Sequence, residues 1–175
     1  LELQTQTNFE FMAAEKRKNV EFCATDASKE VVSGILKFLL TITALSLPQV
    51  ARGIFADGFG IKVLLFLTSE MKFRSQALKI LSTFAYNSTT QEFLRCASDV
   101  VAEVCEMLIK NSKSLAASEQ KYALAIVCLP AENACTRLKL RRSGIFKILL
   151  DITATTRSEE ELNLLIFAFY QFRFD

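Results

Sequence analysis

The sequence predicts an all-α protein that is built as a solenoid of repeated helical units. One observation is a recurring apolar octet: IKVLLFLT at 61–68 returns as FKILLDIT at 146–153; six of the first seven positions match in kind, and both octets end in Thr. A second is composition, because 51% of the 175 residues are apolar and only 5 are Gly and 2 are Pro. Such a chain favours long helices over a turn-rich all-β fold or disorder. An element that recurs along a chain indicates a stack of similar units.

Helix start and stop signals divide the chain. Thr89–Glu92 and Ser158–Glu161 fit the capping box, in which the hydroxyl accepts from a free helical N–H and the carboxylate returns to the cap. Ser69-Glu70 and Ser118-Glu119 are weaker versions of this signal. Breaks are expected where proline or turn residues interrupt the apolar pattern, at Leu47-Pro48, Asp57-Gly58, Ser98-Asp99, Leu129-Pro130 and Ser143-Gly144.

These signals predict ten helices in a long, short, long order that repeats about every 42 residues. They are expected at 29–46, 48–56, 59–68, 70–86, 90–97, 100–111, 118–129, 131–142, 145–154 and 159–174. Gly58, Asp99 and Gly144 fall at equivalent turns. VAEVCEML at 101–108 keeps the apolar skeleton of the octet and is expected to be its middle copy.

The stretch at 118–155 resembles one complete unit of the armadillo-repeat family, and 31–69 and 74–112 resemble it less closely. The resemblance implies a right-handed α-solenoid of three-helix repeats, although the two-helix HEAT repeat stays open. Residues 1–28 then form an N-terminal segment that belongs to a preceding repeat helix. The repeats themselves are expected at about 29–69, 70–112 and 113–155, with a partial repeat at 156–175.

Members of this family bind extended segments or helices of other proteins along a groove lined by the third helices. The resemblance therefore implies a non-enzymatic scaffold with a protein partner. Its concave side is expected to carry Lys79, Thr83, Tyr86, Lys121, Gln171 and Arg173. The family's best-known grooves use an Asn ladder helped by Trp, but Thr83, Cys128 and Gln171 occupy those rungs here and Trp is absent. Only Gln171 keeps an amide.

The aromatic ends FAYN (84–87) and FRFD (172–175) resemble those of armadillo proteins that also carry a BTB domain. Such proteins act as substrate adaptors of cullin-type ubiquitin ligases. The resemblance implies the same adaptor role here.

A basic edge is formed by Arg137, Lys139, Arg141 and Arg142, on a predicted short helix. Its ordinary interpretation is a solvated outer face. The alternative is a second binding surface for an acidic protein motif or a phosphate backbone, which would make the chain a helical-repeat nucleic-acid-binding module. The net charge of +2 provides no field that would steer nucleic acid to the whole protein.

Catalytic and metal sites are mostly excluded because the chain has no histidine. The acidic run 159–161 fits the first turn of a helix, where it meets the positive end of the macrodipole. The five cysteines show no CxxC pair and are expected to be buried, reduced thiols of a cytoplasmic or nuclear protein. We expect no metal and no cofactor.

The apolar run at 34–47 is too short for a bilayer and carries Lys37, so a buried helix is expected there, without membrane contact. The C-terminal stretch at 164–175 is apolar on nearly every side. Either a further repeat follows it, or it associates with a second copy of the chain. The former is favoured, because an end unit of a solenoid normally carries a polar cap.

Overall fold

The computed structural model describes residues 26–45, 59–86, 91–111 and 114–173. Over these residues the protein is helical, with eight α-helices, one 3₁₀ helix and no strand, which confirms the predicted all-α class. The chain divides into two compact units, 1–38 and 39–175.

The described helices follow the expected order closely. They are α2 (Asp26–Leu45), α4 (Phe59–Ser69), α5 (Arg74–Tyr86), α6 (Gln91–Asn111), α7 (Ala117–Cys128), η1 (Leu129–Glu132), α8 (Ala134–Ser143), α9 (Phe146–Thr155) and α10 (Glu159–Phe172). The short helix expected at 48–56 lies outside the described residues, as do the breaks at Leu47-Pro48 and Asp57-Gly58.

Helix α2 carries the apolar run that was expected to be buried. Leu36 is buried, but Val31, Ile35 and Phe38 are exposed along one side of the helix. The expectation of a buried helix at 34–47 therefore holds for Leu36 but not for Ile35 and Phe38.

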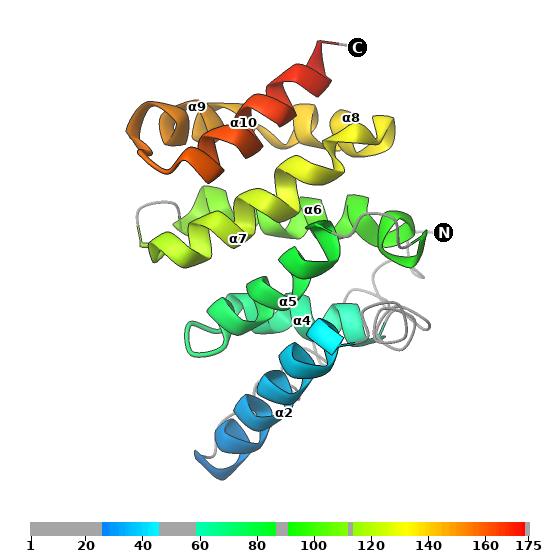
Figure 1. The fold of residues 1–175 in the computed structure, drawn as a ribbon, viewed down its shortest axis with the longest axis vertical. Helices are drawn as coiled ribbons and strands as arrows, with labels where there is room; N and C mark the ends of the chain where they lie inside the picture. Colours follow the sequence, from blue (N-terminus) through cyan, green and yellow to red (C-terminus); the bar gives the residue numbers. More distant parts are fainter. Residues whose placement is uncertain (1–25, 46–58, 87–90, 112–113, 174–175) are drawn as a thin grey trace, which may run out of the picture. The chain divides into compact units, whose positions relative to one another are not determined.

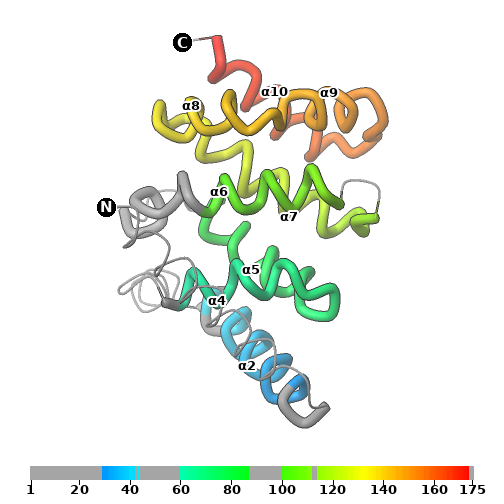
Figure 2. Tube along the Cα trace, turned by 180° about the vertical axis from the view of Figure 1, so that it is seen from behind, coloured from blue at the N-terminus to red at the C-terminus, as the bar shows by residue number. Residues whose placement is uncertain are grey.

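Helices α4 to α10 of the second unit lie in two rows. Helix α7 packs against both α5 and α10, and α6 packs against both α4 and α8. Figure 1 has α7 and α10 in front, and Figure 2, seen from behind, has α6, α8 and α9 nearer. The two rows are joined where α4 packs on α5, α6 on α7 and α9 on α10.

The three copies of the octet lie in α4, α6 and α9 and bury the same positions. The fourth position of each copy is buried, at Leu64, Val104 and Leu149, and so is the seventh, at Leu67, Met107 and Ile152. Positions three residues apart lie on one face of a helix. The repeated letters therefore encode one apolar face, which packs toward the interior in α4, α6 and α9.

Helix α6 is longer than predicted. The break expected at Ser98-Asp99 is wrong, because one helix runs from Gln91 to Asn111. Neither Gly nor Pro interrupts this stretch, and interior Ser and Asp each cost well under about 1 kcal/mol of helix propensity. Burial of Val100, Val101 and Val104 outweighs that cost.

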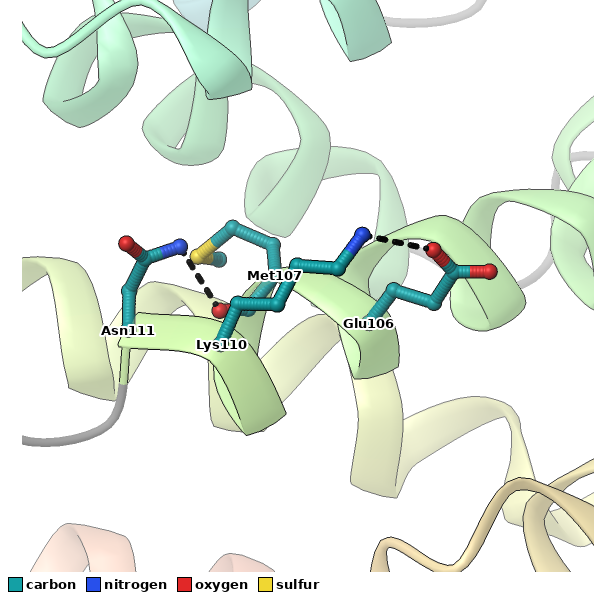
Figure 3. A network of polar contacts seen from close by, with 4 residues as sticks. All are labelled: Glu106, Met107, Lys110 and Asn111. Atoms are coloured by element: carbon teal, nitrogen blue, oxygen red, sulfur yellow. Dashed lines mark hydrogen bonds and ion pairs between the residues drawn. The ribbon is translucent and has the colours of Figure 1, made fainter.

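The end of α6 is held by its own side chains (Figure 3). Asn111 Nδ2 donates to the Met107 carbonyl oxygen at 3.0 Å, which satisfies one of the free carbonyls at the C-terminus. Lys110 Nζ lies 3.1 Å from Glu106 Oε2, an exposed pair one turn apart. Lys110 also places a positive charge at the negative end of the helix.

The connection between α4 and α5 differs from the prediction of a helix that begins at residue 70. The Glu70 carbonyl oxygen accepts from both Phe73 N (3.0 Å) and Arg74 N (2.9 Å), so residues 70–73 form a turn. The buried Arg74 side chain donates through Nε to the Thr68 carbonyl oxygen at 2.9 Å. This bond ties the start of α5 to the end of α4.

The breaks at Leu129-Pro130 and Ser143-Gly144 are confirmed. Helix α7 ends at Cys128 and η1 follows, with Pro130 in its first turn. Gly144 caps α8 in the left-handed conformation, with φ 75° and ψ 9°. A glycine adopts this conformation without the steric cost that a Cβ imposes.

Candidate protein-binding face

The first row brings together residues that are far apart in the sequence. Tyr86 ends α5, Lys121 lies in α7, and Glu160 lies in the first turn of α10. Tyr86 Oη donates to Glu160 Oε1 at 3.1 Å, and Lys121 Nζ lies 2.6 Å from Glu160 Oε2. One carboxylate therefore joins the side chains of three neighbouring helices at the surface.

The ionisation of these groups reflects their contacts. The hydrogen bond from Lys121 lowers the pKa of Glu160, and the same bond raises the pKa of Lys121. Burial, followed by the hydrogen bond to Glu160, raises the pKa of Tyr86 to about 12. At neutral pH the cluster is a carboxylate, an ammonium and a neutral phenol, a combination in which every group has a partner of the right kind.

A second polar contact between α7 and α10 lies directly beside this cluster. Gln120 Nε2 donates to Glu161 Oε2 at 3.3 Å, and Thr156 Oγ1 donates to the same oxygen. Ser158 caps α10, since its Oγ accepts from Glu161 N at 3.4 Å. The predicted capping box is half confirmed, because only the bond to the Ser158 hydroxyl forms. The Glu161 carboxylate does not return to Ser158 N but accepts from Gln120 and Thr156. Ser158 N donates instead to Thr156 Oγ1 at 3.2 Å.

The remaining residues predicted for the concave side differ in exposure. Lys79 is exposed on α5, and Thr83, one turn later, is half-buried with its hydroxyl bonded to the Lys79 carbonyl oxygen at 2.9 Å. Gln171 is half-buried in the last turn of α10, and Cys128 is fully buried at the end of α7. The three ladder positions, Thr83, Cys128 and Gln171, are therefore not equally accessible, because the Cys128 side chain is not exposed to solvent.

Arg173 lies elsewhere on α10. Its guanidinium carbon stands 3.9 Å from the centre of the Tyr170 ring, and its Nη2 donates to Tyr170 Oη at 2.8 Å. At 100° per residue, Arg173 and Glu160 point to different sides of the helix. We therefore define a candidate surface, called the binding face below, as Lys79, Thr83, Tyr86, Lys121, Glu160 and Gln171. The sequence did not mark Glu160 as a candidate, because its place in an acidic first turn has an ordinary structural explanation.

The four residues of the basic edge differ in exposure. Lys139 and Arg142 are exposed on α8, and Arg141 is exposed while its Nη2 donates to the Phe172 carbonyl oxygen at 2.7 Å. Arg137 is buried, and its Nη1 donates to the carbonyl oxygens of Ala131 (3.1 Å) and Glu132 (2.8 Å). Arg137 thus stabilises the junction of η1 and α8, which leaves three residues of the edge at the surface.

The three cysteines within the described residues differ in exposure. Cys105 and Cys128 are buried free thiols, as expected, whereas Cys135 is exposed, against the expectation. Burial raises the pKa of Cys105 to about 12 and raises that of Cys128 as well, which keeps both sulfurs protonated and poorly nucleophilic. Within the described part of the chain, no three His, Cys, Asp or Glu side chains are grouped so that they could hold a metal ion.

Comparison with protein-family models, with curated proteins and with solved structures finds no match for this chain. Over the residues that the structure describes, no helix is both long enough and apolar enough to cross a membrane.

Proposed function

We propose that this chain is a right-handed, armadillo-like solenoid that acts as a non-enzymatic protein-binding scaffold. A partner segment, extended or helical, would lie across α5, α7 and α10 on the binding face. The observation that carries the proposal is the Glu160 carboxylate, which places Tyr86 and Lys121 on one continuous surface over three helices. In a stack of repeats, a surface of this kind lengthens with each added unit.

The repetition of the helix pairs supports the solenoid. The pairs α4–α5, α6–α7 and α9–α10 follow one another along the chain, the helices of each pair are in contact, and each octet copy turns its fourth and seventh positions inward. A closed bundle around one centre has no reason to repeat such a pattern three times, at 61–68, 101–108 and 146–153. The narrower role of ubiquitin-ligase adaptor rests on the resemblance of the aromatic helix ends alone.

The chemistry of the binding face indicates the kind of partner. Lys79 and Lys121 are cationic, Glu160 is anionic, Tyr86 presents half-exposed aromatic surface, and Gln171 offers an amide. Tyrosine is enriched among residues that dominate binding energy, and exposed charges mainly steer association. We therefore expect a partner segment that combines an apolar or aromatic anchor beside Tyr86 with acidic side chains near the two lysines.

The test compares two charge reversals of equal size. Lys79→Glu/Lys121→Glu alters the binding face, and Lys62→Glu/Lys147→Glu alters exposed lysines of α4 and α9 in the second row. Both variants and the unaltered chain are immobilised, and proteins captured from a cell extract are quantified by mass spectrometry. Loss of the same partners from the first variant only is the expected result; partners retained equally by both variants would refute the proposal.

The basic edge is tested separately with Arg141→Glu/Arg142→Glu. Unchanged capture of partners by this variant removes the edge as a protein-binding surface. If the edge bound a phosphate backbone, affinity for a nucleic-acid duplex would fall steeply with added salt. A flat salt response dismisses the nucleic-acid alternative.

A further inference from the structure

The two lysines of the binding face differ in their ion pairs. Lys121 Nζ lies 2.6 Å from Glu160 Oε2, so a carboxylate of the chain itself balances its charge. Lys79 is exposed on α5 and, within the part of the chain that the structure describes, forms no ion pair with a carboxylate. A partner that approaches the binding face therefore meets one balanced and one unbalanced ammonium group.

The surroundings of Lys79 contain little negative charge. Residues 71–91 include three Lys or Arg and no Asp or Glu. Helix α4, which packs on α5, has no acidic residue. Glu119, the acidic residue of α7, is buried and accepts from the Ala116 N–H. Glu132 of η1 is exposed but forms no ion pair with Lys79. The α5 side of the binding face is therefore cationic.

The contacts of Glu160 indicate how this surface holds a carboxylate. Glu160 accepts from Tyr86 Oη at 3.1 Å and pairs with Lys121. A second carboxylate beside Lys121 would meet the negative charge of Glu160, and like charges at close range repel each other. Lys79 has no carboxylate beside it, and Ser75, exposed one turn earlier on the same side of α5, adds a hydroxyl donor. An incoming carboxylate is therefore favoured at Lys79 and disfavoured at Lys121.

We propose that Lys79 selects an acidic side chain of the partner segment, whereas Lys121 is a positioning residue that holds Glu160 beside Tyr86. The inference rests on the proposed function and names the chemistry that the binding face selects. The occupant is a protein segment whose acidic residue lies over α5 and whose contacts over α7 and α10 are not acidic. Because the unbalanced charge lies at one end of the face, it also fixes the direction in which the segment crosses the three helices.

Selection of random linear peptides, displayed on phage, against the immobilised chain tests this assignment. Peptides that bind the unaltered chain are expected to share an Asp or Glu at one recurring position. Selection on Lys79→Glu should replace it with Lys or Arg, whereas selection on Lys121→Gln should keep the acidic residue. Lys62→Glu, which reverses an exposed lysine of α4 in the second row, is the matched control and should also keep it.

The size of the effect is measured with one selected peptide and a copy in which the acidic residue is replaced by its amide. Since exposed ion pairs are weak, the amide is expected to lower the affinity for the unaltered chain by about 2- to 5-fold. The same replacement should make no difference on Lys79→Gln and the full difference on Lys121→Gln. A difference that persists on Lys79→Gln, or that disappears on Lys121→Gln, overturns the proposal.

A tyrosine variant separates this inference from the proposed function. Tyr86 is half exposed, so Tyr86→Ala removes surface rather than core. If no peptide is selected, or if the selected peptides bind Tyr86→Ala as tightly as the unaltered chain, the proposed function itself fails. If the peptides require Tyr86 but share no acidic residue, or keep that residue in the selection on Lys79→Glu, the face binds a partner and the role assigned to Lys79 is wrong.

Discussion

At the scale of single residues, Glu160 links three helices, and its ionisation is the most direct report of that link. Lys121→Met removes the group that lowers the pKa of Glu160. We expect the Glu160 pKa to rise toward its ordinary value in this variant, as measured by carboxyl chemical shifts in an NMR pH titration. An unchanged Glu160 titration would mean that Lys121 does not contact it in solution.

The sign of the pH effect follows from the same shift. Because the folded-state pKa of Glu160 is lowered, its contribution to stability is present above the pKa of the unfolded chain. That contribution is lost as the pH falls through the folded-state pKa. Since both partners are exposed, we expect the loss to be small and reduced further by salt.

Arg137 belongs to the basic run of α8, but its guanidinium stabilises the junction of η1 and α8. Arg137→Ala leaves the carbonyl oxygens of Ala131 and Glu132 without their guanidinium donor, in a buried junction. We expect a loss of about 1–3 kcal/mol in the free energy of unfolding, measured by urea denaturation. Arg142→Ala, on the exposed side of the same helix, is the control and should stay within about 0.5 kcal/mol of the unaltered chain. Equal effects of the two changes would contradict this role.

At the scale of helices, replacing glycine with alanine is expected to change stability in opposite directions at two positions. Gly144→Ala forces a Cβ into the left-handed conformation at φ 75° and should destabilise the protein by about 1 kcal/mol. Gly34 lies inside α2 with no atom within 4 Å of an added Cβ, so Gly34→Ala should increase helix stability by about 0.5–1 kcal/mol. Thermal unfolding followed by circular dichroism gives both signs. Two effects of the same sign would contradict the assigned backbone conformations.

The helices that were predicted well are those with strong local signals. Ser158 starts α10, Pro130 ends α7 and Gly144 ends α8, because each acts through the backbone of its own turn. The break at Asp99 failed because its signal is weak and the packing of neighbouring valines decides the local structure. Helix α5 began later than expected because Arg74 anchors a turn through the Thr68 carbonyl oxygen, which no sequence signal marks.

At the scale of the molecule, the sequence predicted the all-α class and most of the described helices but not how far each side chain is exposed. The octet predicted the buried fourth and seventh positions in α4, α6 and α9, because apolar periodicity is a property of the sequence. The cluster around Glu160 could not be predicted, since it joins residues of three helices whose distances depend on packing. The burial of Arg137 and of Cys128 depends on the same tertiary contacts.

The scaffold proposal requires a stack of helix pairs in which each pair packs mainly against the adjacent pairs. In such an array, stability is close to a sum of unit and nearest-neighbour terms, so that a local defect has local effects. Leu165 is fully buried in α10, and Leu165→Ala should cost about 2–5 kcal/mol through the cavity that it leaves. A defect at this position therefore discriminates between a stack and a closed bundle.

Hydrogen exchange of the Leu165→Ala variant, followed by mass spectrometry of peptides from each helix, is the most direct measurement. We expect faster exchange in α9, α10 and the facing side of α7, and unchanged protection in α4 and α5. Leu138→Ala, at an exposed position of α8, should leave all helices unchanged. A uniform loss of protection from α4 to α10 would contradict the stacked arrangement, and with it the proposed scaffold.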